Sequence, residues 1–302
     1  MNKVSIYGGL GNQMFQFALA IVLDVEGIPT KISIRNFFVY NHHQGFELSK
    51  VFSVPLRPID KVKIFLLEWG APVWKLKLVR WFMSRFINIY NKYDNSKFNE
   101  KGEFIYDSTV FNVKNSMIIG TWQSEGYLIN HEKLIKEVFN FNKPKDYKNS
   151  TLSKKIFDSN SVAVHVRRGD YTSMEWKSSH MVITDPKYYI DSIAKLRSKL
   201  VNPVFYFFSD DISWIKNNFK GDDFVFVSHN KNGNSYIDMY LMSLCKHFII
   251  ANSTFSWWAA WLSTNPDKLV IMPEPWLKNI QTPGIYPESW LPVSVDLEQV
   301  SA

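Results

Sequence analysis

The chain has 302 residues, of which 46% are hydrophobic and 21% are charged, so a disordered chain is excluded and the length suits one large domain or two smaller ones. The single cysteine, Cys245, excludes a disulfide framework and a thiolate metal site and indicates a reducing compartment. A formal net charge of +7 favours anionic partners such as nucleotides, nucleic acid or an acidic membrane surface.

The first residues predict the start of an α/β domain. Residues 4–7 form an apolar run typical of a buried strand, residues 14–23 carry apolar side chains at helical spacing, and residues 30–34 resemble a second strand. This order is that of a βαβ unit. A signal peptide's apolar core and cleavage site are missing, and no run of about 18 uncharged apolar residues predicts a membrane span, so we expect a cytoplasmic protein.

Residues 61–92 form a basic, tryptophan-rich, amphipathic stretch that contains a single acid, Glu68. Such a stretch can lie on an anionic bilayer, which would make the protein a peripheral one at the inner face of the plasma membrane. Alternatively, it covers the core of its domain and turns its basic face to solvent. The sequence leaves both interpretations open.

A polar segment with a proline at 142–150 is the best candidate for a linker between two domains. After it, apolar runs alternate with helical patterns, which indicates a parallel, doubly wound sheet. The predicted strands are 161–166, 204–208, 224–227, 248–251 and 269–272, and the predicted helices are 186–200, 212–219, 235–245 and 255–262.

Polar clusters follow four of these strands. They lie at 165–171, 209–211, 228–230 and 252–256. Ligands of open α/β sheets bind beyond the carboxyl ends of the strands. Four such clusters on one edge of a sheet therefore predict a binding site.

The strongest cluster contains Arg167 and Arg168. Strand alternation places His165 and Arg167 on one face of the sheet, with Arg168 toward the other. The small Gly169 lets the chain turn sharply after them. Arginine forks can bind a diphosphate through charge-assisted hydrogen bonds. The competing interpretation is a structural ion pair with Asp170, but one nearby acid cannot neutralise two buried guanidinium groups.

The cluster after the fourth strand opens a helix. Its residues are Asn252, Ser253, Thr254, Phe255 and Ser256. The backbone N–H groups of a helix start, together with serine and threonine hydroxyls, can bind an anion. An ordinary N-cap explains the same residues equally well, and the neighbouring arginine pair is what favours phosphate.

The first loop contains Gly9 and Gly11, which match two of the three glycines of a dinucleotide-binding fingerprint. Met14 stands where the third glycine would lie, and no acidic residue ends the second strand, so an NAD site is excluded. The loop still allows close approach to its backbone, with Asn12 and Gln13 as its polar tips.

A metal ion is the alternative way to hold a diphosphate. Asp210 and Asp211 are adjacent in sequence, whereas glycosyltransferases that use a metal typically carry two aspartates separated by one residue. Side chains of adjacent residues diverge, so we expect no metal site here. One of the two is instead expected to be the N-cap of the helix at 212–219.

Taken together, these motifs resemble those of the bacterial and animal α-1,2-fucosyltransferases of glycosyltransferase family 11. The His-x-Arg-Arg-x-Asp block and the Asn-Ser-Thr-Phe-Ser-Trp-Trp block are the most specific. The matching segments are 9–16, 123–125, 165–171, 208–211, 238–243 and 251–258. The stretch 37–115 follows no pattern of this kind, and we expect acceptor selection to lie there.

The resemblance implies an α/β fold of the GT-B type, in which two Rossmann-type lobes enclose a cleft. Residues 1–148 would form the acceptor-side lobe and residues 149–302 the lobe that binds GDP-fucose. The implied reaction is an inverting transfer of L-fucose from GDP-fucose to the 2-hydroxyl of a galactoside, without a metal or another cofactor. The implied acceptor is a surface glycan of the O-antigen type, free or lipid-linked, and no nucleic acid partner is expected.

The resemblance also implies roles for single residues. Arg167 would contact the diphosphate, with Arg168 second in importance, and Asp238 would contact guanine. The other substrate-binding residues implied by the motifs are His165, Gly9, Gly11, Asn12, Gln13, Gln123, Glu125, Asn252, Ser253, Thr254, Phe255 and Ser256.

The base that accepts the proton of the acceptor hydroxyl is left open among Asp170, Glu125 and Glu47, and a dissociative path needs no strong base. Two other functions also stay open. One is a glycosyltransferase that uses another GDP-sugar, and the other is a glycan-binding protein without catalysis.

Overall fold

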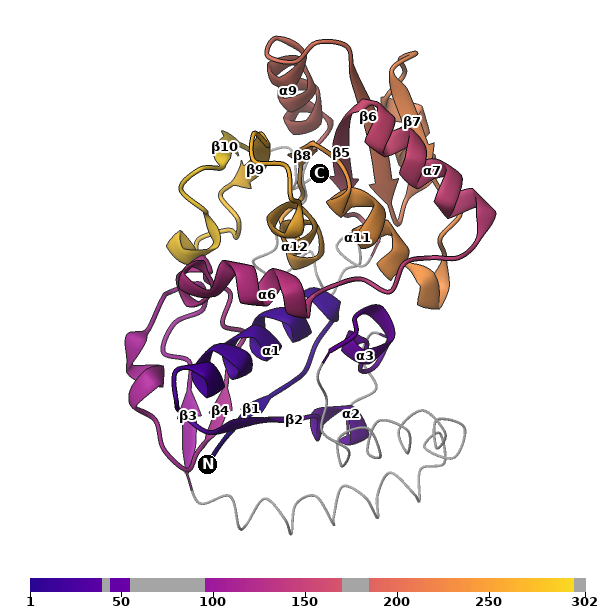
Figure 1. Cartoon of the computed structure of the whole chain (residues 1–302). Coiled ribbons are helices and arrows are strands. Elements are labelled where there is room, and N and C mark those ends of the chain that lie inside the picture. The colour runs from indigo at the N-terminus through magenta and orange to yellow at the C-terminus, as the bar shows by residue number, and fades with distance from the viewer. Residues whose placement is uncertain (40–43, 55–95, 170–184, 296–302) are drawn as a thin grey trace. The chain divides into compact units, whose positions relative to one another are not determined.

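The computed structural model describes residues 1–39, 44–54, 96–169 and 185–295. The chain forms two compact units, Met1–Asn142 and Lys143–Ala302 (Figure 1). The basic stretch 61–92 and Asp170 lie outside the described residues. No helix in the described ranges is long and apolar enough to cross a membrane.

The first unit is built on a four-stranded parallel sheet of order β2-β1-β4-β3. Its strands are β1 (Asn2–Ser5), β2 (Thr30–Ser33), β3 (Lys97–Asn99) and β4 (Met117–Ile119). Its α-helices are α1 (Leu10–Val25), α2 (Asn36–Val39), α3 (Leu48–Val51) and α6 (Glu132–Val138). The predicted βαβ unit is confirmed by β1, α1 and β2.

Helix α1 begins four residues earlier than its apolar periodicity predicts. Gly8 has φ 79°, a left-handed conformation that favours glycine, and Gly9 is extended at the N-cap position. This turn sends the chain directly from β1 into the helix. The apolar side chains of α1, such as Met14 and Leu19, are fully buried, so packing against the sheet stabilises the helix.

The second unit is built on a six-stranded parallel sheet of order β10-β9-β8-β5-β6-β7. Its strands are β5 (Asn160–Val166), β6 (Pro203–Ser209), β7 (Phe224–Val227), β8 (His247–Ile249), β9 (Val270–Glu274) and β10 (Leu291–Ser294). Its helices are α7 (Tyr147–Asp158), α9 (Pro186–Arg197), α10 (Ile212–Asn218), α11 (Tyr236–Ser243) and α12 (Thr254–Leu262).

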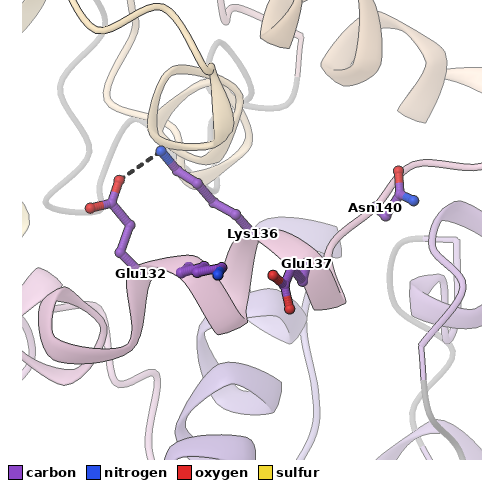
Figure 2. A pocket seen from close by; sticks show the side chains of 5 residues that line it. Glu132, Lys136, Glu137 and Asn140 are labelled. Atoms are coloured by element: carbon purple, nitrogen blue, oxygen red, sulfur yellow. Dashed lines mark ion pairs between the residues drawn. The ribbon is translucent and has the colours of Figure 1, made fainter.

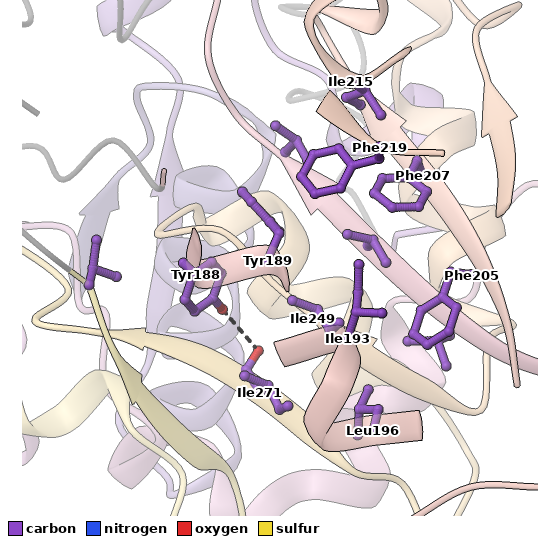
Figure 3. Packing of buried hydrophobic residues seen from close by; sticks show 14 residues of the cluster. Tyr188, Tyr189, Ile193, Leu196, Phe205, Phe207, Ile215, Phe219, Ile249 and Ile271 are labelled. Carbon is purple, nitrogen blue, oxygen red and sulfur yellow. Dashed lines mark hydrogen bonds between the residues drawn. The ribbon is translucent and has the colours of Figure 1, made fainter. Parts of the chain in front are cut away.

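Helices cover both faces of this sheet. On one face, side chains of α9 and α10 pack with alternate residues of β5 and β6 in a buried cluster that includes Tyr189, Phe205 and Phe207 (Figure 3). On the other face, the Tyr206 hydroxyl donates to the backbone of Lys155 in α7 at 3.1 Å. The strands are apolar on both sides because both sides are covered. The predicted α/β class, with a parallel sheet in each of two lobes, is confirmed.

Two elements differ from the sequence expectation. The expected linker at 142–150 contains the start of α7, whose N-cap Asp146 accepts a hydrogen bond from the N–H of Asn149 at 2.9 Å. Strand β10 is a sixth strand that the apolar pattern did not predict, since it lies at the edge of the sheet and its side chains are half-buried or exposed. Its Pro292 is tolerated because an edge strand has one side without ladder bonds.

Candidate functional site

The carboxyl ends of β5, β6 and β8 lie side by side in the sheet of the second unit. The predicted site residues His165, Arg167 and Arg168 lie at the end of β5, and the predicted residues 252–256 follow β8. The register of β5 and β6 pairs Val166 with Ser209. Arg167 and Asp210 directly follow these two paired residues, and Arg168 and Asp211 come next in the two segments.

Asp210 holds the turn that follows β5. Its carboxylate lies 3.0 Å from Nη1 of Arg167 and accepts the backbone N–H of Arg168 at 3.0 Å. A Cβ at Gly169 would come within 2.7 Å of the same carboxylate, so this position favours glycine. Arg167 is therefore oriented by a neighbouring strand while its side chain stays 33% exposed.

Arg168 points toward α10. Its guanidinium lies over the ring of Trp214, 4.2 Å from the centroid, and its Nε lies 3.7 Å from the carboxylate of Asp211. Asp211 also accepts the N–H of Trp214 at 3.0 Å. The expectation that Asp210 or Asp211 is the N-cap of this helix is confirmed, and the residue is Asp211. Trp214 is a contact that the motifs alone did not single out.

The two arginines thus have two acidic partners, one each. The expectation that the two arginines lack enough nearby acid is wrong, because Asp210 and Asp211, which follow β6, lie beside them in addition to the Asp170 that was considered. Neither ion pair is deeply buried, since the side chains of Asp210 and Asp211 are 28% and 39% exposed.

His165 connects β5 to the first turn of α12. Its Nδ1 lies 2.8 Å from the hydroxyl oxygen of Ser256, and its ring packs on Phe255 with centroids 5.8 Å apart. The hydroxyl of Tyr189 donates to the backbone oxygen of His165 at 3.0 Å. Burial, and next the charge of Arg167, lower the pKa of His165 to about 3. The ring is therefore a neutral link between two strand ends.

We expect His165→Gln to flatten the dependence of stability on pH. A histidine whose folded pKa is depressed gives its full stabilisation above the ordinary value near 6.5, and this is lost as the pH falls toward 3. Urea unfolding between pH 7 and pH 4 should show a shallower slope for the variant. His131→Gln in the first unit is the matched control, and equal slopes for all three proteins would contradict the assignment.

The start of α12 is not an ordinary capped helix. Ser253 is the N-cap residue and is extended, but its side chain accepts no hydrogen bond from the first turn. The amide of Asn252, which is buried, donates to the backbone oxygen of Trp276 at 3.3 Å and so binds the segment after β9. Among the alternatives, the side-chain N-cap interpretation is not supported at Ser253.

Asp238 lies in the first turn of α11 and contacts the segment that follows β7. Its carboxylate accepts from the amide of Asn230 at 2.8 Å, and Asn230 exchanges two amide hydrogen bonds with Asn149 of α7, at 2.9 and 3.1 Å. His229 joins the same group, with Nε2 lying 2.8 Å from the amide oxygen of Asn149. Burial raises the pKa of Asp238 to about 7.

In the first unit, the predicted polar tips of the loop have different surroundings. The amide of Gln13 is fully buried, donates to the backbone oxygens of Gly8 and Gly45 at 2.9 and 2.8 Å, and accepts the N–H of Glu47 at 2.9 Å. Asn12 instead accepts from the amide of Gln123 at 3.1 Å. Gln13 therefore shapes the loop, and Asn12 connects it to the segment after β4.

The glycines of this loop also differ in what they do. Gly9 is the N-cap of α1 and Gly11 is buried within it. Gly8, which was not among the predicted site residues, has the positive φ, and a Cβ there would lie 2.9 Å from the amide nitrogen of Asn12. The Gly-Gly turn in the sequence was the signal for this position.

Two of the candidate bases lie in the described part of the chain, both in the first unit. Glu47 is 7% exposed, and burial raises its pKa to about 7. Glu125 opens a 3₁₀ helix, Glu125–Tyr127, and is half-buried. A carboxyl group whose pKa lies near neutrality suits a general base, which favours Glu47 on chemical grounds.

A shallow hollow of about 520 Å³ lies on α6, and none of the residues that line it was predicted for the site (Figure 2). It is lined by Glu132, Lys133, Lys136, Glu137 and Asn140. Lys136 lies 2.6 Å from the carboxylate of Glu132, and the acids balance the lysines, so the hollow has no anion-binding character. Over the described ranges, no group of three or more His, Cys, Asp or Glu side chains is placed to hold a metal ion.

The known proteins that this chain is similar to are glycosyltransferases. The model of glycosyl transferase family 11 matches residues 75–291. An alpha-1,2-colitosyltransferase of Escherichia coli is 36% identical over 295 residues, which cover 94% of this chain and 96% of that protein. An O-antigen biosynthesis glycosyltransferase of Escherichia coli is 29% identical over 301 residues, which cover 94% of this chain and 97% of that protein. Mouse galactoside alpha-(1,2)-fucosyltransferase 2 is 29% identical over 142 residues, which cover 45% of this chain and 41% of the mouse protein.

Proposed function

The chain belongs to glycosyl transferase family 11 and is a glycosyltransferase, and we propose that it transfers L-fucose from GDP-L-fucose to the 2-hydroxyl of a galactoside. The relatives named for α-1,2 transfer support the linkage. The proposal for the donor site rests on the hydrogen bond between His165, at the end of β5, and Ser256, in the helix that follows β8. This hydrogen bond lies next to the arginine pair, which directly follows β5.

In the proposed mechanism, the acceptor hydroxyl gives its proton to a general base or to water and attacks the sugar carbon from the face opposite to GDP, so the bond from that carbon to the β-phosphate oxygen breaks and the configuration is inverted. Positive charge develops on the sugar ring and negative charge on the β-phosphate. Arg167, Arg168 and the first turn of α12 would stabilise this leaving group, which is the part that a metal ion plays in other enzymes. Their orientation by Asp210 and Asp211 supports a preorganised site that needs no metal.

Asp238 is proposed to read the guanine base. Guanine presents two N–H donors on one edge, and a carboxylate can accept both. The hydrogen bonds that link Asn149, Asn230 and Asp238 hold this carboxylate in place. We further propose an acceptor of the O-antigen type, which is the class that one Escherichia coli relative is named for, and action at the inner face of the plasma membrane.

A second donor is favoured by a specific observation, the 36% identity to a colitosyltransferase. Colitose is L-fucose without the 3-hydroxyl, so the two donors differ by one hydrogen-bonding group. If the site binds that hydroxyl, we expect the kcat/KM for GDP-L-fucose to exceed that for GDP-colitose by about tenfold or more. Steady-state assays with each donor measure the ratio.

A ratio inverted in favour of GDP-colitose would overturn the proposed donor and keep the α-1,2 transfer. GDP-mannose serves as the matched control, because it has the same nucleotide and a different sugar. Turnover of GDP-mannose as fast as the other two donors would show that the site does not select its sugar.

A further inference from the structure

Three strand ends of the first unit are tied together by two side chains. Glu100, directly after β3, accepts the N–H of Thr121 at 2.7 Å, the hydroxyl of Thr121 at 3.2 Å and the N–H of Trp122 at 3.1 Å. Gln16 of α1 accepts the N–H of Tyr7 at 2.9 Å and donates to the backbone oxygen of Gly120 at 3.2 Å. The ends of β1, β3 and β4 are thereby fixed to each other.

The segment after β4 is held in a conformation that it would not adopt alone. Trp122 has φ 58°, a left-handed conformation that is strained for a residue with a bulky side chain. A Cβ at Gly120 would lie 2.5 Å from the Cβ of Glu100 and 2.6 Å from its carboxylate oxygen. The glycine is therefore required for Glu100 to lie over this segment, and the two hydrogen bonds to the backbone hold the turn at Trp122.

The same segment carries the Gln-Ser-Glu motif. Trp122 is 1% exposed and packs between Phe98, at 6.3 Å between centroids, and Tyr127, at 5.8 Å. The next residue, Gln123, then reaches the side chain of Asn12 at 3.1 Å. The position of this pair of amides depends on the turn that Glu100 holds.

We propose that Glu100 is a positioning residue for the acceptor. Its carboxylate sets the loop 120–125 so that Gln123 and Asn12 can bind hydroxyl groups of the galactoside. Paired amides suit this ligand class, because each amide both donates and accepts hydrogen bonds. The proposal rests on the proposed function, since it takes the first unit as the side that receives the acceptor.

The test is Glu100→Gln, in which one acceptor oxygen is replaced by an NH₂ group that faces backbone donors. We expect the KM for a β-galactoside to rise about tenfold to a hundredfold, because hydrogen bonds to a charged group are lost. The KM for the GDP-sugar and its slow hydrolysis without acceptor should stay within about twofold, since these depend on the second unit.

Glu103→Gln is the matched control. Glu103 is exposed, lies three residues away, and its loss changes the net charge equally. Thr121→Val removes a single hydrogen bond to Glu100 and should raise the same KM by several-fold only, which provides a second measurement if Glu100→Gln does not fold. Thermal unfolding establishes that each variant is folded at the assay temperature.

Equal changes in both KM values, or an unchanged acceptor KM in folded Glu100→Gln, would overturn the proposal. Absence of transfer by the wild-type protein with either donor would instead contradict the proposed function itself. The two failures are therefore distinguishable.

Discussion

Replacing Arg167 by lysine should lower kcat/KM for transfer by a hundredfold or more, which corresponds to about 3 kcal/mol of lost transition-state stabilisation. Lysine keeps the charge and can still meet Asp210, but it cannot offer two parallel N–H donors to a diphosphate. Single-turnover assays with saturating GDP-L-fucose separate this loss from weaker donor binding.

The matched control for this variant is Arg197→Lys. Arg197 also forms an arginine–aspartate pair, with Nη2 lying 2.8 Å from the carboxylate of Asp223, and it lies against Phe224. Asp223 stands directly before β7, so this pair is at the amino edge of the same sheet, opposite to the strand ends of the site. Near-normal transfer by Arg167→Lys, or an equal loss in Arg197→Lys, would remove Arg167 from its assigned role.

Replacing Asp238 by asparagine should change stability and donor binding in opposite directions. The folded pKa near 7 lies above the ordinary value of 3.8, so the wild-type protein loses stability as the pH rises from about 4 to about 7. The variant does not bury a charged carboxylate, so we expect it to be more stable than the wild-type protein by up to about 4 kcal/mol at pH 8, with no gain near pH 4. Its affinity for GDP should fall about tenfold, because guanine loses a charged acceptor.

Urea unfolding at pH 4 and pH 8 and calorimetric titration with GDP measure the two effects. Asp222→Asn is the control, since Asp222 is exposed and its replacement changes the net charge equally. A gain in stability without loss of GDP affinity would show that Asp238 is a buried acid with no part in donor binding. Loss of affinity for ADP to the same degree would show that it does not read the base.

The parallel sheet of the second unit was predictable because its strands are apolar runs that end in polar clusters. Five of its strands, and the meeting of His165, Arg167 and Ser256 at one edge, follow from that pattern and from the rule that ligands bind at strand ends. Strand β10 was not predicted, because its exposed residues and proline do not form an apolar run. Helix α7 was not predicted either, because its start shares the polar, lysine-rich composition of a linker.

The side chains that orient the site were harder to predict than the site itself. Asp210 and Asp211 could be assigned to the arginines only with the register of β5 and β6. Glu100 follows a three-residue strand in a region without a recognised pattern. Its partners include backbone N–H groups, which every residue type except proline carries, so the sequence does not indicate them. Contacts between a side chain and a distant backbone require the fold.

Fucosyl transfer can be measured directly by incubating the protein with GDP-L-fucose, a β-galactoside and EDTA, and by determining the linkage of the product by NMR. We expect one GDP to be released for each α-fucosyl group found on the 2-hydroxyl of galactose, at a rate that EDTA leaves unchanged. A protein that neither consumes GDP-L-fucose nor binds it in calorimetry would not be a fucosyltransferase that uses this donor.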